Sequence, residues 1–548
     1  MSRRTNSGRG GARRGGAALV AALLCAVTAC SSAPDDAADE DPHIPGLPSP
    51  SVAGEAGPAP TAVPELPSVP EEFTKQEPNW SACGAPSAAQ GGGAAPGADW
   101  ECAGLTVPLD YADPDPDGRT LDLALVRSRT DSEQRVGSLV FNFGGPGGSG
   151  VATLPRMEQR FEPLAGAFDL VSLDPRGVGD SEGVVCLDGP GRDAMLATTA
   201  APRDAAGEEE FLARRHSYAA ACADASGDLL PHLTTANTAR DLDILRQVLG
   251  ESRLHYYGAS YGTKLGGVYA GLFPERVGRT VLDSVVDPTV DVVGRALGQT
   301  TGFQLALDHY LADCVAGPDC PAGRDLPEAY RFLGGLLDGL ADQPLPAGEG
   351  RLLTQGLAVT GIVGSLYSEG SWQRLSRGLR EADREGRGDI LLAAADRYHG
   401  RGQQGGYRNL HDANTAINCA DFASRPDLDT VRAHRAEFEA ASPVLGRFLV
   451  WELLGCTGWE SNSDRDQPEV AAEGAARTIL LVATTGDPAT PYHGAERMRD
   501  ALGEDVAALL TYDGEGHGAY TSGNPCVTAA VNAHLLSGTT PDDGTMCT

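Results

Sequence analysis

The sequence predicts an α/β fold, in which a mostly parallel sheet is covered by helices on both faces and interrupted by a large, mainly helical cap. Two patterns lead to this prediction. Short apolar runs alternate with helical stretches up to residue 288 and again from residue 477, as in parallel sheets with crossover helices. Between residues 289 and 476 helix-like segments replace the alternation, which indicates an insertion.

The first 75 residues are expected to precede the fold. Arginines followed by the short apolar run Gly16–Cys30 are typical of an export signal, here residues 1–29, and the run is too short to span a membrane stably. Its last four residues, Val-Thr-Ala-Cys, resemble a bacterial lipobox, which implies lipidation of Cys30. The alternative is an ordinary signal peptide with an incidental cysteine. Residues 30–75, rich in Ala, Pro, Asp and Glu, are expected to form a disordered tether.

The N-terminal part of the core is expected to occupy residues 76–288. Its apolar runs are bounded by Gly, Pro and Asp turns, as strands are, and its amphipathic stretches have helical spacing. Glycine-rich segments follow several of these runs, at the sheet edge where ligands bind in open α/β sheets. The predicted strands are residues 102–111, 119–129, 137–143, 168–174, 253–258 and 278–286, and the predicted helices are 234–250 and 260–277.

The cap is expected to span residues 289–476, and the core resumes over residues 477–548. The last two predicted strands of the core each lead into a loop with a polar residue, Asp487 in the first and His517 in the second. The predicted elements are cap helices at 301–315 and 329–342, strands at Ile479–Ala483 and Ala507–Tyr512, and a closing helix at 526–538.

A serine, an aspartate and a histidine each follow a predicted strand. Ser260 lies in Gly258-Ala-Ser-Tyr-Gly262, between a strand and a helix, and the order Ser260, Asp487, His517 is that of the α/β-hydrolase fold. His517 would take the proton of the Ser260 hydroxyl during attack on a carbonyl, and Asp487 would orient and stabilise the imidazole. Taken singly, each of the three is equally well a turn or loop residue, so the constellation carries the prediction.

Two further parts of such a site can be assigned. Asp283 and Asp287 follow the strand after the serine and are rival acids, but Asp487 lies where the fold more usually places its acid. An oxyanion needs donors already in place. One is expected to be the backbone N–H of Tyr261, and the other an N–H of the glycine-rich loop 144–147.

Composition limits the partners. The net charge is −32, so nucleic acid is not expected as a partner. Of twelve cysteines, Cys25 and Cys30 lie in the signal, and the other ten fall as sequence neighbours, which indicates five disulfides in an exported protein, although other pairings are open. The neighbouring pairs are Cys83 and Cys102, Cys186 and Cys222, Cys314 and Cys320, Cys419 and Cys456, and Cys526 and Cys547. We expect no metal, since no C-x-x-C pair or Cys/His cluster occurs, and no cofactor.

Five segments together resemble the exported tripeptidyl aminopeptidases of actinomycetes, in the prolyl-aminopeptidase-like branch of α/β hydrolases. They are NFGGPGGSG, FDLVSLDPRGVGDSEG, YYGASYGTKLGGVYAGLFPERV, LLVATTGDPATPYHGAERM and GHGAY. The resemblance runs from about residue 100 to the C-terminus. It implies a serine exopeptidase that acts on chains with a free amino end and uses Ser260, Asp487 and His517. It also implies the Gly145 N–H as the second oxyanion donor.

One residue departs from the family pattern. Phe143 stands where prolyl aminopeptidases have a histidine, which argues against strict proline specificity. The family includes exported members with lipobox cysteines, in agreement with a cell-surface lipoprotein whose contact with the membrane is the lipid at Cys30, with or without partial release to the medium.

An aminopeptidase must also bind the substrate ammonium, for which a carboxylate under the cap is suited. The candidates are Glu369, Asp421 and Glu452, and our hypothesis names Asp421 and Glu452, although the more common interpretation of each is a surface acid. The predicted function is therefore a secreted serine aminopeptidase releasing short peptides. The alternatives are a carboxylesterase or lipase-type hydrolase with the same triad, and a binding protein on an inactive hydrolase fold.

Overall fold

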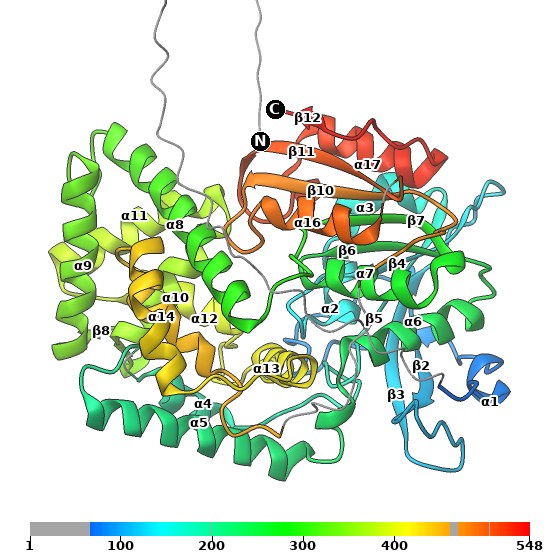
Figure 1. The fold of residues 1–548 in the computed structure, drawn as a ribbon, viewed down its shortest axis with the longest axis horizontal. Coiled ribbons are helices and arrows are strands. Elements are labelled where there is room, and N and C mark those ends of the chain that lie inside the picture. The colour runs from blue at the N-terminus through cyan, green and yellow to red at the C-terminus, as the bar shows by residue number, and fades with distance from the viewer. Residues whose placement is uncertain (1–65, 199, 461–469, 504) are drawn as a thin grey trace, which may run out of the picture. The chain divides into compact units, whose positions relative to one another are not determined.

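A computed structural model describes residues 66–198, 200–460, 470–503 and 505–548 (Figure 1). The predicted signal, Cys30 and residues 31–65 of the predicted tether lie outside the described residues. The end of that tether is corrected, because Phe73 of helix α1 (Glu71–Thr74) is buried in the core and Leu66 and Val69 pack against the same cluster. These apolar side chains tie residues 66–75 to the domain. Within the described ranges, no helix is long and apolar enough to cross a membrane.

The central sheet has ten strands in the described part of the chain, in the order β1-β2-β3-β5-β4-β6-β7-β10-β11-β12. Pairing is antiparallel from β1 to β5 and parallel from β5 to β12. The strands are β1 (Ser81–Ala82), β2 (Trp100–Pro108), β3 (Thr120–Ser128), β4 (Gly137–Asn142), β5 (Phe168–Leu173), β6 (Leu254–Ala259), β7 (Val277–Asp283), β10 (Ile479–Gly486), β11 (Ala507–Glu515) and β12 (Thr545–Cys547). All eight predicted strands are confirmed, and the fold is the α/β-hydrolase fold.

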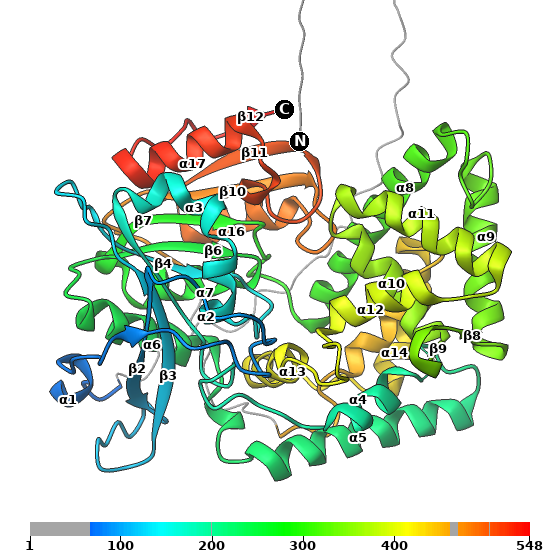
Figure 2. The same cartoon turned by 180° about the vertical axis from the view of Figure 1, so that it is seen from behind.

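The two faces of the sheet belong to two hydrophobic clusters, because side chains alternate along each strand. In β10, for example, Ile479 and Leu481 belong to one cluster, and Leu480 and Val482 to the other. One face is covered by α6 (Thr235–Val248), α7 (Tyr261–Leu272) and α16 (His493–Leu502), and the other by α2 (Gly150–Arg156), α3 (Glu158–Ala165) and α17 (Pro525–Ser537). Figure 2 shows this layered arrangement from behind.

The insertion between β7 and β10 is mainly helical and has a hydrophobic cluster of its own, as predicted for the cap. A short antiparallel pair, β8 (Leu345–Pro346) and β9 (Leu352–Leu353), interrupts it. Its helices are α8 (Val292–Ala316), α9 (Leu326–Asp342), α10 (Gln355–Leu366), α11 (Trp372–Arg380), α12 (Asp389–His399), α13 (Leu410–Asp421), α14 (Leu428–Ala441), α15 (Gly446–Leu449) and the 3₁₀ turn η6 (Val450–Leu454).

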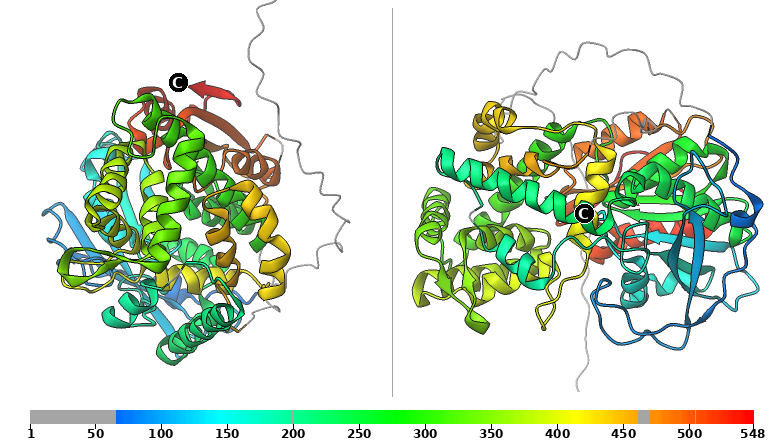
Figure 3. Two further views of the ribbon diagram at one scale, coloured as in Figure 1. Left: turned by 90° about the vertical axis from the view of Figure 1, so that its left-hand side faces the viewer. Right: turned by 90° about the horizontal axis from the view of Figure 1, so that it is seen from below.

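Two helices that lie within residues 76–288, the range expected to belong to the core, pack on the cap instead. They are α4 (Gly189–Leu196) and α5 (Ala205–Ser226), which lie beside the cap helices in both views of Figure 3. Phe211 of α5 is buried in one cluster with Phe438 and Trp451 of the cap. The boundary between core and cap at residue 288 is therefore corrected. The cap is built from two insertions, and the position of the first one, with α4 and α5, in the sequence did not reveal that it packs on the cap.

The five neighbouring cysteine pairs predicted from the sequence all form disulfides. One of them, Cys419–Cys456, joins α13 to the segment after η6 and so closes a wall of the cap. Another, Cys526–Cys547, fixes the short edge strand β12 to α17.

Candidate active site

Ser260 occupies the sharp turn between β6 and α7. Its φ of 56° and ψ of −123° are a conformation that non-glycine residues rarely adopt, and such strain at a strand–helix junction characterises a nucleophile elbow. The two flanking glycines are needed for packing. A Cβ on Gly258 would lie 2.4 Å from the Gly262 carbonyl oxygen, and a Cβ on Gly262 would lie 2.7 Å from that of Asn142. No larger side chain fits at either position.

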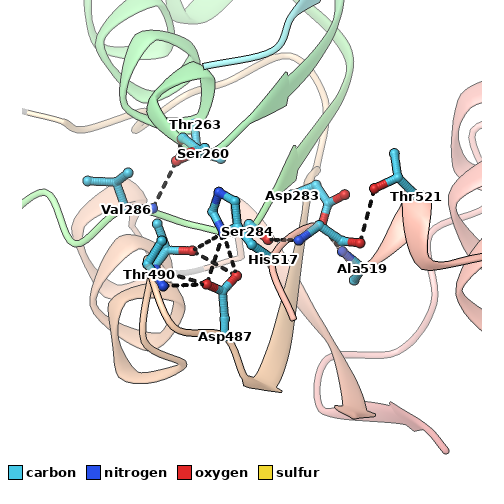
Figure 4. Close-up of polar contacts among 12 residues, drawn as sticks. Ser260, Thr263, Asp283, Ser284, Val286, Asp487, Thr490, His517, Ala519 and Thr521 are labelled. Atoms are coloured by element: carbon cyan, nitrogen blue, oxygen red, sulfur yellow. Dashed lines mark hydrogen bonds and ion pairs between the residues drawn. The ribbon is translucent and has the colours of Figure 1, made fainter. Parts of the chain in front are cut away.

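His517 and Asp487 meet beyond the ends of β11 and β10. The imidazole Nδ1 lies 2.9 Å from each Asp487 carboxylate oxygen. The carboxylate is itself held by the backbone N–H groups of Ala489 and Thr490, both at 2.9 Å, and by the Thr490 hydroxyl at 3.0 Å. In Figure 4 the His517 ring lies between Ser260 and Asp487. The structure thus brings together the three residues predicted as a triad.

The electrostatics of this pair favour an ionised aspartate. Burial alone would raise the pKa of Asp487, but the facing His517 outweighs it and holds that pKa below its usual value. Burial alone would lower the pKa of His517, yet the Asp487 carboxylate raises it above the ordinary imidazole value. His517 is therefore a stronger base than a free histidine, as a proton acceptor for serine requires.

The rival acids have other partners. The carboxylate of Asp283 accepts hydrogen bonds from the N–H groups of Ala519 and Tyr520 at 2.9 and 3.1 Å and from the Tyr257 hydroxyl at 2.8 Å. Asp283 thus anchors the loop that carries the histidine. Asp287 pairs with Arg497 at 3.0 Å. Of the three aspartates, Asp487 is the one that contacts the imidazole.

Backbone contacts also join the elbow to the histidine loop. The Ser260 N–H donates to the Asp283 carbonyl at 2.9 Å, and the Gly518 N–H donates to the hydroxyl of the next residue, Ser284, at 2.7 Å (Figure 4). Residues 283–284 therefore fix the serine turn and the histidine loop to one strand end. Sequence reasoning considered Asp283 as a rival acid and did not anticipate this anchoring role.

The cap reaches the site through Tyr367, which follows α10. Its backbone carbonyl accepts a hydrogen bond from the backbone N–H of His517 at 2.9 Å. Its ring contacts the imidazole of His517 edge-on, with ring centroids 5.5 Å apart. The cap therefore helps to position the histidine. Tyr367 lies in no recognisable motif, so no signal in the sequence could have identified it.

The glycine-rich loop after β4 lies against the elbow. A Cβ on Gly144 would lie 2.8 Å from the Ser260 Cβ and 3.0 Å from the Tyr261 nitrogen, so only a glycine allows this approach. Tyr261 opens α7, where the first N–H groups of a helix have no partner within the helix. Gly145, the next residue of the loop, lies on the wall of the cap cavity. Both predicted oxyanion donors thus belong to segments that adjoin Ser260.

A cavity of about 440 Å³ extends from this point under the cap. Gly145 and Tyr367 connect it to the elbow and to the histidine loop, and residues of α4, α5, α8, α10, α12 and α13 line the rest. The disulfide Cys419–Cys456 forms part of its wall. Neither Ser260 nor His517 is among the lining residues, so the cavity adjoins the elbow through Gly145 and the histidine loop through Tyr367.

The carboxylates predicted to bind an amine are placed differently. Asp421 is buried, accepts the Thr235 N–H at 2.8 Å and pairs with Lys264 at 2.7 Å, so its charge is already neutralised. Glu452, in η6, lines the cavity, and its carboxylate has no hydrogen bond or ion pair to any residue that the structure describes. Glu369 lies in an exposed turn outside the cavity lining.

Known proteins match the chain over most of its length. A family profile described as TAP-like protein matches residues 442–547. A serine protease, Hip1, of Mycobacterium tuberculosis is 37% identical over 459 residues, 81% of this chain and 87% of that protein. The chain belongs to the TAP-like family of α/β hydrolases.

Other TAP-like relatives carry different activities in their names. The tripeptidyl aminopeptidase of Streptomyces lividans is 31% identical over 82% of this chain and 85% of that protein. The carboxylesterase B of Mycobacterium tuberculosis is 34% identical over 81% of this chain and 86% of that protein. This TAP-like protein is accordingly a serine hydrolase, with relatives named for peptide and for ester substrates.

Proposed function

We propose that this TAP-like hydrolase is an exported serine aminopeptidase, which cleaves peptide bonds near a free N-terminus and releases short peptides, tripeptides among them. The observation that carries the proposal is Glu452. It puts a solvent-exposed carboxylate, without an ion pair among the described residues, on the wall of a cavity that adjoins the elbow loop through Gly145, and such a carboxylate can accept a substrate ammonium. An ester substrate without an amine makes no such ion pair.

The proposed reaction starts at Ser260. Its Oγ attacks the carbonyl carbon of the scissile bond while the Nε2 of His517 takes the hydroxyl proton, and Asp487 stabilises the imidazolium through Nδ1. The tetrahedral intermediate then breaks its C–N bond, and His517 passes the proton to the leaving amine. Water then gives a proton to His517 as its oxygen attacks the acyl carbon, the C–O bond to Ser260 breaks, and His517 returns the proton to the Ser260 oxygen, which restores the free serine.

Negative charge develops on the carbonyl oxygen during both steps. We assign its stabilisation to the N–H groups of Tyr261 and Gly145, which belong to the helix start and the loop on either side of Ser260. The loss of one such donor typically slows an enzyme about 100- to 1000-fold.

A carboxylesterase is the second candidate, supported by the relative of that name. A panel separates the two: free-amine tripeptide amides, the same peptides with an acetylated N-terminus, and short acyl esters. The proposal expects the highest kcat/KM for the free-amine peptides. A protein that hydrolysed the esters and left all peptides intact would overturn it.

An inactive binding protein is the third candidate. A fluorophosphonate probe distinguishes it from both enzymes, because the probe labels only an activated serine. We expect labelling of the wild-type protein at Ser260. A protein that remained unlabelled and hydrolysed nothing would be a binding protein on this fold.

We also propose that the protein is exported and held at the cell surface by lipid on Cys30, based on the signal-like segment and the lipobox-like residues. In a lipid-labelling experiment, the wild-type protein should incorporate the label and partition with membranes. The Cys30→Ala protein should do neither. Incorporation of lipid by the Cys30→Ala protein would refute the assignment.

A further inference from the structure

An arginine without an ion pair lies on the wall of the cavity. Arg295, in α8, lines it, and its guanidinium stacks over the Phe422 ring at 5.1 Å. Its buried Nε has no hydrogen-bond partner, and the guanidinium forms no ion pair within the described ranges. Burial lowers the pKa of Arg295, although Glu452 and Asp421 raise it in part. A buried cation that lacks a close counter-charge is costly unless a ligand supplies one.

Two of the other three arginines of the lining have counter-ions in the protein. Arg192 pairs with the buried carboxylate of Asp412. Arg214 pairs with Glu210 at 2.7 Å, and Arg215 stacks over the Phe211 ring at 5.1 Å. Arg295 therefore differs from Arg192 and Arg214, whose charges have counter-ions in the protein itself.

The charge of the lining is opposite to that of the chain. Four arginines and a single acid, Glu452, line the cavity, and two of these arginines, Arg215 and Arg295, have no counter-ion among the described residues, whereas the whole chain carries −32. The two lining histidines add no charge, because burial lowers the pKa values of both His399 and His411. A cavity of this kind favours a ligand that carries a carboxylate.

Arg295 and Glu452 are near enough to interact electrostatically, yet they form no ion pair with each other. Asp421, the other acid near Arg295, is already paired with Lys264. One cation and one anion thus face the same cavity without neutralising each other directly. A ligand with an ammonium and a carboxylate a few bonds apart would satisfy both.

We propose that the substrate peptides begin with an acidic residue, whose ammonium group binds Glu452 and whose side-chain carboxylate binds the guanidinium of Arg295. The proposal rests on the proposed aminopeptidase function and adds the class of N-terminal residue. Aspartate and glutamate carry the required pair of charges on one residue. A glutamine or lysine at the same position lacks the carboxylate.

Binding to the Ser260→Ala protein tests this without requiring turnover. Tripeptide amides with N-terminal Glu, Gln or Lys followed by two alanines are titrated calorimetrically. We expect the Glu peptide to bind about tenfold more tightly than the Gln peptide, since one charge-assisted contact is gained. Adding Arg295→Gln should abolish the difference, and adding Arg295→Glu should make the Lys peptide the tightest. Arg214→Gln, on an arginine with its own counter-ion, is the matched control and should keep the Glu preference.

Equal affinity for the Glu and Gln peptides would overturn the proposal. A preference for the Glu peptide that persists in the Arg295→Gln protein would overturn it too, as would a preference for Glu only at the second position of the peptide. If an Arg295 variant does not fold, the Glu-to-Gln ratio of the protein with intact Arg295 still decides. A different result would refute the proposed aminopeptidase function, namely an active enzyme that cleaves esters and no peptides. Hydrolysis of free-amine peptides without a preference for N-terminal acids would leave that function standing and refute only the acidic specificity.

Discussion

The sheet edge and the cap cavity differ in how their charged groups are satisfied. At the sheet edge, Asp487 and Asp283 each accept several hydrogen bonds from the protein. In the cavity, Glu452 and Arg295 have no ion-pair partner among the described residues. The first arrangement fixes reacting groups in one geometry before substrate arrives, and the second leaves charges available to a ligand. Loss of a reacting group at the edge should therefore abolish turnover, whereas changes in the cavity should alter which substrate is bound.

The largest effect is expected for Ser260→Ala. Without the hydroxyl no acyl-enzyme forms, so kcat should fall by at least about 10⁴-fold. Ser284→Ala is the matched control, because Ser284 also follows a strand and also has a positive φ. The control should keep far more of kcat than Ser260→Ala and should still be labelled by a fluorophosphonate, since it loses hydrogen bonds to the Gly518 N–H and to the Asp487 carboxylate but no reacting group. Substantial turnover by Ser260→Ala would refute the nucleophile.

Substitutions of Asp487 and Asp283, the two aspartates at the sheet edge, should differ in their effect on kcat in the same assay. Asp487→Asn should reduce kcat by about 10⁴-fold, because an amide neither stabilises the imidazolium nor fixes its tautomer. Asp283→Asn removes an anchor of the histidine loop and should chiefly lower the thermal midpoint of unfolding, with a smaller loss of kcat. Equal losses of kcat in the two variants would contradict the roles assigned to them.

The same contrast explains what could be predicted from the sequence. The strands and the positions of Ser260, Asp487 and His517 were predictable because apolar periodicity and turn residues are local signals, and the three residues follow strands whose ends meet at one edge. The disulfides followed from their spacing. Tyr367 and the anchoring role of Asp283 were not predictable, because each depends on contacts between segments far apart in the chain.

The cap was predicted only in outline. Helical segments between 289 and 476 were recognised, but the packing of α5 onto them arises from buried apolar contacts that leave no motif. The partners of the cap carboxylates were equally hidden. Asp421 and Glu452 look alike in the sequence, and only Asp421 has a lysine beside it.

Glu452→Gln should give a more moderate effect, confined to binding. We expect KM for free-amine peptides to rise about tenfold, with little change for the acetylated peptides, because only the former pair with the carboxylate. Asp421→Asn is the comparison: it leaves Lys264 without its counter-ion, so it should reduce stability and leave the ratio of the two KM values unchanged. If the ratio of the two KM values changed in Asp421→Asn and not in Glu452→Gln, then Asp421 rather than Glu452 would be the residue that binds the substrate ammonium.

The smallest effect concerns pH. His517 acts as a base only when neutral, and Asp487 raises its pKa, so kcat/KM should rise with pH through a midpoint above the ordinary value of about 6.5. The pH profile should be measured with an acyl ester as substrate, because an ester has no amine whose own titration would alter the profile. In Asp487→Asn the residual activity should titrate at lower pH, because burial, which lowers the pKa of His517, is then opposed only by the more weakly acting Asp283.

The stability of the fold should respond to pH in the opposite direction. The protonated His517 pairs with Asp487 in the folded protein, so this contribution is fully present below the unfolded pKa of histidine and is lost as pH rises through the raised, folded value. Wild type and Asp487→Asn, compared by thermal unfolding on both sides of the midpoint, should differ more at the lower pH. A stability difference that grew toward alkaline pH would mean that the Asp487 carboxylate does not stabilise the protonated form of His517 in the folded protein. The reacting groups at the sheet edge would then be no more preorganised than the charged groups of the cavity.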